Sequence, residues 1–376
     1  MYWRLSGFYF FYFASLGALI PYWGLYLRSL GFSVVEIGEL VAIIMATKIV
    51  APNIWGWIAD HTGQRMKIVR IGCLMSTLLF AAVFVVHGYW WMALVMTGFS
   101  FFWNAALPPF EANTLNHLGA DTHRYSSIRL WGSIGFILTV AALGALFEQA
   151  GTGWLPVVLI GLFAAIWLAS LLVPEKTVGQ QHHEHLSLRE VLQQPVVISV
   201  LLVCFLVQAS HGPYYTFYSI YMSEHGYSET LIGELWALGV VAEIGVFLKM
   251  RSWLPRYGAR RLLLSATALT ALRWLLLAGF VDKPWIMVLA QTLHAASFGL
   301  YHAVSIHLFH QLFRGRLQGR GQALYSSVSF GAGGAAGSFA AGYLWQGAGA
   351  GWMYLAAAAV AALALVIAWR GVRDVD

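Results

Sequence analysis

Charged residues and cysteines are scarce in this chain. Only 10% of its 376 residues are Asp, Glu, Lys or Arg, and 59% are hydrophobic. A soluble chain has about 25% charged and about 45–50% apolar residues, so the composition excludes a water-soluble enzyme. The two cysteines, Cys73 and Cys204, lie far apart in apolar stretches, which excludes a disulfide framework and a Cys-x-x-Cys metal motif. With 16 acidic residues and long apolar stretches, the net charge of +6 does not indicate a nucleic-acid surface.

Long apolar stretches fill most of the sequence. A membrane-spanning helix needs roughly 20 mainly apolar residues. The first stretch follows Arg4 without a small-residue cleavage site, so it is interpreted as a retained membrane helix rather than a signal peptide. We expect twelve spans, near 5–27, 35–57, 68–86, 90–115, 125–147, 154–173, 196–222, 231–250, 262–280, 285–309, 321–345 and 352–369.

Lys and Arg in the short loops set the orientation. Nearly all of them fall on one side of the predicted membrane, and only Arg28 and Lys283 fall on the other. Positive loops mark the cytoplasmic side, so both termini are expected there. The predicted organisation is an N-terminal six-helix bundle over 1–173, a cytoplasmic linker over 174–195 and a C-terminal six-helix bundle over 196–376.

The linker carries two local patterns. His182-His-Glu-His185 resembles a metal-binding tract, but adjacent side chains in a loop make a poor coordination cage, so no metal site is predicted. Ser187-Leu-Arg-Glu190 fits a capping box that begins a short surface helix.

The two halves contain an internal repeat. Gly31-Phe-Ser-Val-Val-Glu-Ile-Gly-Glu-Leu40 reappears 195 residues later as Gly226-Tyr-Ser-Glu-Thr-Leu-Ile-Gly-Glu-Leu235. Each half holds an even number of spans, so the copies have the same orientation in the membrane. Such parallel repeats are typical of alternating-access transporters that bind substrate between their halves near the membrane midplane.

Several motifs resemble a known family. Gly56-Trp-Ile-Ala-Asp60-His-Thr-Gly-Gln-Arg65-Met-Lys67 is similar to the loop signature of the major facilitator superfamily. Three further motifs resemble its phenylpropionate permease branch, which is distantly similar to lactose permease: Arg129-Leu-Trp-Gly-Ser-Ile-Gly135, Gly239-Val-Val-Ala-Glu243, and Gln291-Thr-Leu-His294 with His302. The resemblance implies an all-α membrane protein with twelve helices in two pseudo-symmetric six-helix bundles. It also implies proton-coupled uptake of a small organic solute and a cytoplasmic gating latch of Asp60 with Arg65.

Ionisable residues deep in the predicted spans are functional candidates, because each costs free energy unless it is paired or hydrated. Glu111 and Arg129 lie nine residues on either side of position 120, in the turn of a helical hairpin, so they share a depth and can face each other. Arg273 and His294 are equidistant from the turn at 282–284 in the same way. The alternative is that these pairs only hold helices together. The remaining candidates are Lys48, Glu243 and His302.

The resemblance to lactose permease assigns coupling roles. It implies that Glu111, Arg129, Glu243, Arg273 and His294 form its charged set, but Ser297 stands where that permease has a proton-carrying glutamate. We therefore expect the proton on Glu243, Glu111 or His294, in that order, with His302 as a further candidate. Lys48 occupies the repeat position of Glu243. It is expected to meet the substrate, or a dipole from the eleventh span, rather than Glu243.

Aromatic residues on the first and seventh spans predict the solute. The two spans are expected to line the cavity by analogy with the superfamily, and their rings suit a ligand with one ring and one polar end. Arg129 or Arg273 is expected to hold a carboxylate through its guanidinium fork. The other candidate substrate contacts are Tyr22, Trp131, His211, Tyr214, Tyr215 and Tyr218.

The favoured hypothesis is a bacterial inner-membrane symporter, monomeric in the membrane, that couples proton entry to uptake of an aromatic or other small carboxylate. A sugar or nucleoside symporter is the alternative. An intramembrane enzyme would need a nucleophile with its base or a metal triad, and a receptor would need a signalling domain; neither pattern is present. No cofactor, metal or nucleic-acid partner is expected.

Overall fold

The structure is a computed structural model that describes residues 1–119, 121, 124–176, 188–315 and 317–372. The described residues are helical throughout, apart from turns and short connections. They form two compact units. Unit 1 contains 1–181 together with 228–237, and unit 2 contains 182–227 together with 238–376, so one helix contributes to both units. The tract His182–His185 lies outside the described residues.

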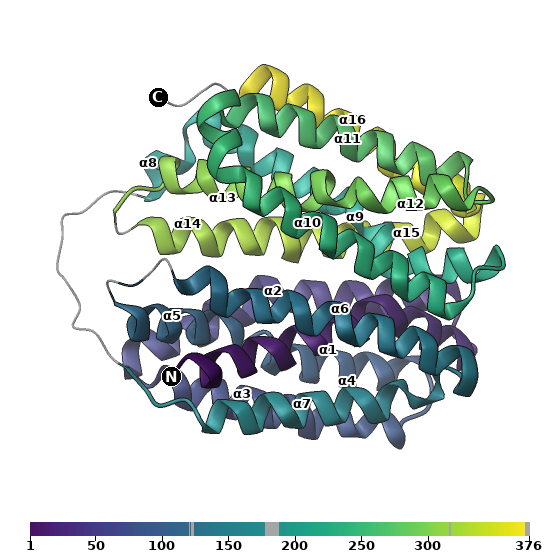
Figure 1. The fold of residues 1–376 in the computed structure, drawn as a ribbon, viewed down its shortest axis with the longest axis horizontal. Coiled ribbons are helices and arrows are strands. Elements are labelled where there is room, and N and C mark those ends of the chain that lie inside the picture. Colours follow the sequence, from purple (N-terminus) through teal and green to yellow (C-terminus); the bar gives the residue numbers. More distant parts are fainter. Residues whose placement is uncertain (120, 122–123, 177–187, 316, 373–376) are drawn as a thin grey trace. The chain divides into compact units, whose positions relative to one another are not determined.

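The first half of the chain provides six spanning segments (Figure 1). The fourth is interrupted after Trp103, because Pro108 and Pro109 lack the N–H groups that would continue the helical ladder. The elements are α1 (Tyr2–Ser29), α2 (Val34–Thr62), α3 (Arg65–Phe80) with η1 (Ala81–Phe84), α4 (Tyr89–Trp103) with α5 (Leu107–Leu118), α6 (Tyr125–Ala150), and η3 (Thr152–Trp154) with α7 (Leu155–Leu171).

The second half provides six more. Its fourth and fifth segments each contain a π-helical stretch. The short helix expected within the linker is present as α8, although its expected cap Ser187 lies outside the described residues. The elements are α8 (Leu188–Leu192), α9 (Pro195–Glu224), α10 (Glu229–Tyr257), α11 (Ala259–Gly279), α12 (Pro284–Thr292) with η4 (Ala295–Leu300) and α13 (Tyr301–Leu312), α14 (Leu317–Ser326) with η5 (Ser327–Gly333) and α15 (Gly334–Ala348), and α16 (Ala350–Gly371).

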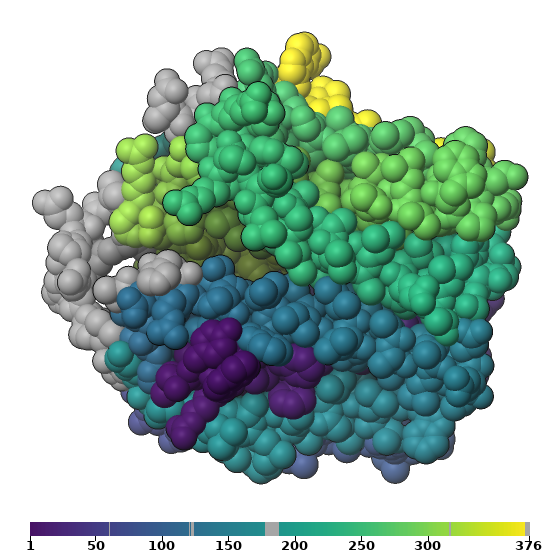
Figure 2. Space-filling view, in the orientation of Figure 1, coloured from purple at the N-terminus to yellow at the C-terminus, as the bar shows by residue number. Residues whose placement is uncertain are grey.

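These segments confirm the twelve expected spans. Within the described residues, eight helical stretches are each long and apolar enough to span a membrane without interruption. The other spans are α2 and the three interrupted segments. Apolar side chains are exposed on both units; Figure 2 shows the purple start of α1 at the surface of unit 1, where Trp3 is 69% exposed. Such a surface fits lipid contact.

Close helix contacts recur at repeat-related positions. In unit 1, a Cβ on Gly135 of α6 would collide with the carbonyl oxygen of Phe10 in α1. In unit 2, a Cβ on Gly333 would collide with the carbonyl oxygen of Phe205 in α9. Phe10 and Phe205 are 195 residues apart, which is the offset of the sequence repeat. Glycine at these positions lets the first and fifth spans of each half approach closely.

Arginine caps the last span of each half. Arg70 of α3 donates from Nη2 to the carbonyl of Val173, 2.9 Å away, just after α7. Arg260 of α11 donates to the carbonyls of Trp369 and Val372 at the end of α16, both at 2.8 Å. The last carbonyls of a helix have no partner within the helix, so a guanidinium satisfies them. The duplicated architecture is therefore fixed by equivalent contacts within each unit.

Candidate functional site

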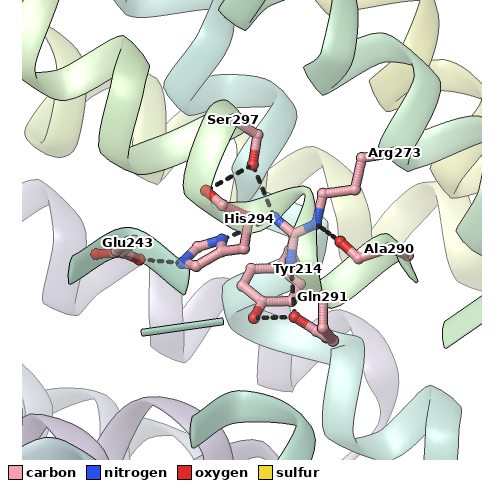
Figure 3. Close-up of polar contacts among 7 residues, drawn as sticks. All are labelled: Tyr214, Glu243, Arg273, Ala290, Gln291, His294 and Ser297. Atoms are coloured by element: carbon pink, nitrogen blue, oxygen red, sulfur yellow. Dashed lines mark hydrogen bonds and ion pairs between the residues drawn. The ribbon is translucent and has the colours of Figure 1, made fainter. Parts of the chain in front are cut away.

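Arg273 is the centre of a buried polar cluster in unit 2 (Figure 3). Its side chain is fully buried and extends from α11. Nε donates to the carbonyl of Ala290 at 2.9 Å, and Nη2 donates to Oε1 of Gln291 at 3.0 Å. Nη1 donates to Nδ1 of His294 at 2.8 Å and to the hydroxyl of Ser297 at 3.0 Å. The guanidinium therefore has protein acceptors on each of its nitrogens.

His294 joins this arginine to Glu243 of α10. Its Nε2 lies 2.7 Å from Oε1 of Glu243. A guanidinium can only donate, so Nδ1 of His294 must accept, and the ring proton must lie on Nε2, where it is donated to the carboxylate. The contacts fix one tautomer of the imidazole. Arg273, His294 and Glu243 thus form a continuous chain of hydrogen bonds (Figure 3).

Local sequence features position these hydrogen-bonded residues. Pro284 starts α12 directly after the turn at 281–283, and the helical hairpin brings His294 level with Arg273, as predicted. Gly239 and Gly299 leave the space that the imidazole and carboxylate occupy. A Cβ on Gly239 would lie 3.1 Å from the His294 ring, and one on Gly299 would lie 3.2 Å from Cγ of Glu243.

Aromatic rings enclose the guanidinium. The Arg273 Cζ atom lies 4.1 Å from the ring centroid of Tyr214 and 4.8 Å from that of Trp274. The Tyr214 hydroxyl donates to Oε1 of Gln291 at 3.1 Å. A cation close to aromatic rings is stabilised by their quadrupoles, so the rings add to the stabilisation that the hydrogen bonds give this arginine.

The charged residues of unit 1 are arranged differently. Glu111 of α5 accepts a hydrogen bond from the Tyr125 hydroxyl at 3.2 Å. Arg129 of α6 lies over the Phe13 ring at 3.6 Å and farther from the Tyr9 ring at 5.7 Å. Within the described residues, Arg129 has no hydrogen-bond acceptor and makes no ion pair, so the expected facing of Glu111 and Arg129 does not give a direct contact. Tyr9 and Tyr125 link the two groups instead, with their ring centroids 6.4 Å apart.

Lys48 is the second basic candidate residue of unit 1. Its side chain is half-buried on α2. In the part of the chain that the structure describes, the ammonium makes no hydrogen bond and no ion pair. Lys48 and Arg129 are therefore cations whose donors remain available, unlike Arg273.

Other candidates from the sequence have structural partners. Tyr22 is fully buried and donates to the carbonyl of Val140 at 2.7 Å. Trp131 donates to the Tyr2 hydroxyl at 3.1 Å near the start of α1. His302 lies with Nδ1 2.8 Å from the Tyr325 hydroxyl.

The rings of α9 cluster together. Tyr214 lies 5.0 Å from Tyr218 and 5.4 Å from Tyr215 between ring centroids, and Tyr215 lies 5.8 Å from His211. Of the two latch residues, Arg65 begins α3, and the side chain of Asp60 lies outside what the structure describes. The latch stays a prediction.

Two partners of the candidate site were missed by sequence reasoning. Tyr125 precedes Arg129 by one helical turn, and Gln291 precedes His294 by nearly one turn, so each lies on the same helix face as a predicted site residue. That spacing was a usable signal. Phe13, whose ring lies under the Arg129 guanidinium, gave no such signal in the sequence, because it lies on a different helix.

Twelve membrane-spanning segments in two repeated halves, with buried ionisable groups in each, define a multi-pass membrane transporter. A family model described as "MFS_1 like family" matches residues 2–356. The chain therefore belongs to the MFS_1-like family of major facilitator transporters, and it is not an enzyme.

Comparison with individual proteins agrees with this family assignment. The probable 3-phenylpropionic acid transporter of Escherichia coli (strain K12) is 30% identical over 349 residues, covering 90% of this chain and 89% of that protein. Maltose permease of Geobacillus stearothermophilus is 27% identical, covering 90% and 87%. The crystal structure of a point mutant of the nucleoside transporter NupG gives a TM-score of 0.87 at 16% identity, covering 99% of this chain and 100% of that one. This last likeness shows the fold alone.

Proposed function

We propose that the protein is a proton-coupled symporter that takes up a small aromatic carboxylate across the bacterial inner membrane by alternating access. One observation carries the proposal: Lys48 and Arg129 of unit 1 are half-buried cations that make no hydrogen bond and no ion pair among the described residues. Since a cation at membrane depth is costly unless it is paired, each is suited to an anionic ligand. In this proposal both termini lie in the cytoplasm, and the transporter acts as a monomer.

Arg129 is the better carboxylate ligand in this proposal. The nitrogens of Arg273 already have protein acceptors, whereas the guanidinium of Arg129 lies over an aromatic ring and donates to no acceptor in the described part of the chain. A guanidinium fork holds a carboxylate through two parallel hydrogen bonds. Phe13, beneath the guanidinium, offers an apolar surface for the remainder of an aromatic acid. Lys48 contributes a second positive charge.

Unit 2 supplies the proton site. While Arg273 donates to Nδ1 of His294, the imidazole cannot take a second proton there, which leaves Glu243 as the group that gains or loses one. A proton on the Oε2 atom of Glu243 leaves Oε1 as an acceptor for Nε2 of His294 but removes the negative charge, which weakens that contact. Protonation is thereby tied to the strength of the contact between α10 and the segment that carries His294.

The substrate class rests on the relatives. The relative from Escherichia coli is named as a probable 3-phenylpropionic acid transporter, which supports an aromatic acid. The alternative is a sugar or nucleoside symporter. The similarity to maltose permease supports the sugar alternative.

A transport assay tests the proposal. Purified protein in liposomes, with the outside acidic, is expected to accumulate labelled 3-phenylpropionate, and maltose and uridine serve as the competing substrates. Arg129→Lys keeps the charge but removes the fork, so KM for the acid should rise by about tenfold or more. Arg124→Lys, at an exposed position just before α6, is the matched control and should leave KM unchanged. Uptake of maltose or uridine without uptake of the acid would replace the aromatic acid with the alternative substrate.

A further inference from the structure

His211 of α9 has one ring nitrogen without a partner. The side chain is fully buried, and its Nδ1 atom lies 2.7 Å from the carbonyl oxygen of Val207, one helical turn earlier. A carbonyl can only accept, so the proton must be on Nδ1 and the Nε2 atom must be a bare acceptor. Among the described residues, Nε2 of His211 has no hydrogen-bond partner.

A second buried polar atom of unit 2, Nε2 of Gln291, is a hydrogen-bond donor rather than an acceptor. Oε1 of Gln291 accepts from both Arg273 and Tyr214, which fixes the orientation of the amide because the guanidinium can only donate. Its Nε2 atom is a buried donor, also without a partner in the described part of the chain. Buried polar atoms without partners are rare in proteins and need an explanation.

Aromatic rings connect the two atoms. The His211 ring lies 4.9 Å from Trp274, edge to face. Trp274 lies 5.9 Å from Tyr214, whose hydroxyl contacts Gln291. The unpaired acceptor and the unpaired donor thus adjoin one aromatic cluster inside unit 2.

We infer that His211 accepts a hydrogen bond from a hydroxyl group on the transported solute, so that the protein prefers ring-hydroxylated aromatic acids to their unsubstituted parents. A phenolic hydroxyl can donate to the bare Nε2 atom of His211. The inference rests on the proposed function. Because His211 is buried in the conformation described, the solute reaches it when the helices move during alternating access.

The expected selectivity follows from the unpaired acceptor. A site that buries a polar atom discriminates against a ligand that leaves this atom unpaired, and one such hydrogen bond corresponds to about a tenfold to hundredfold preference. A hydroxylated acid should therefore have a KM at least about tenfold below that of the parent acid.

The experiment compares 3-phenylpropionate with 3-(hydroxyphenyl)propionates in liposomes. His211→Phe keeps a ring against Trp274 and removes the acceptor, so the preference for the hydroxylated acid over the parent acid should disappear. His225→Phe is the matched control, because His225 makes the same bond to the carbonyl four residues earlier but is exposed after α9. His211→Gln, which restores an acceptor, should recover part of the preference.

The outcomes separate the inference from the proposed function. Equal KM values for the two acids in the wild-type protein, or an equal loss for both acids in His211→Phe, would overturn the role of His211 and leave aromatic-acid transport standing; the equal loss would assign Nε2 to an internal water. Uptake of neither acid by the wild-type protein would overturn the proposed function, and the inference with it. If His211→Phe is not recovered folded, the KM ratio of the two acids is compared between His211→Gln and the wild type. A smaller preference in His211→Gln supports the role of His211, and an unchanged preference overturns it.

Discussion

Replacing Glu243 with Gln should separate solute exchange from uphill transport. The amide oxygen of Gln can still accept the Nε2 proton of His294, so the 2.7 Å contact is kept. The change exchanges a charged hydrogen bond for a neutral one, which costs about 1 kcal/mol and leaves the protein folded. The side chain can no longer gain and lose a proton, so the solute gradient loses its link to the pH gradient.

The magnitude follows from the driving force. With one proton per solute, a gradient of about one pH unit supplies about 1.4 kcal/mol, which corresponds to about a tenfold accumulation. Wild-type liposomes with the outside acidic should approach this ratio, and Glu243→Gln liposomes should stop at equal concentrations. Exchange of labelled for unlabelled acid across the same membranes should continue.

Controls make this prediction refutable. Glu234→Gln changes an exposed carboxylate on the same helix and should accumulate solute like the wild type. If Glu243→Gln also accumulates the acid against its gradient, Glu243 does not carry the proton, and the hydrogen-bond chain in unit 2 is architectural.

Two further predictions concern geometry and stability. A Cβ at position 239 would lie 3.1 Å from the His294 ring, so the branched side chain of Gly239→Val should displace the imidazole and lower proton-coupled uptake more than exchange. Arg260→Gln removes the donors to the last carbonyls of α16, which should lower the free energy of unfolding by about 1–3 kcal/mol in a denaturation assay. Arg261→Gln, at the exposed neighbouring position, should have almost no effect; equal losses in the two variants would contradict the capping role.

The sequence predicted groups at matching depth in each hairpin, and the structure shows a direct contact in only one of them. Arg273 and His294 were expected at one depth and form a hydrogen bond. The same symmetry argument applied to Glu111 and Arg129, but the tyrosines link these groups without a direct contact. Symmetry about a turn fixes how deep a residue lies, whereas the rotation of each helix about its axis decides which neighbour its side chain meets.

The contact between Glu243 and His294 was likewise not foreseen, although both residues were candidates. It depends on the approach of α10 to the segment around His294, which Gly239 and Gly299 permit. The local sequence does not indicate which helix each glycine contacts, because Glu243 and His294 are about fifty residues apart in the chain.

By itself, the sequence determined the number of spans, the duplication and the set of buried ionisable residues. These properties follow from local composition, because a bilayer requires long apolar helices and makes every charge within them exceptional. Only the tertiary structure decided that, among the described residues, each nitrogen of Arg273 has an acceptor, Arg129 and Lys48 keep free donors, and His211 has a bare acceptor. Those differences depend on helix rotation and on contacts between distant segments, and hydropathy carries no information about either.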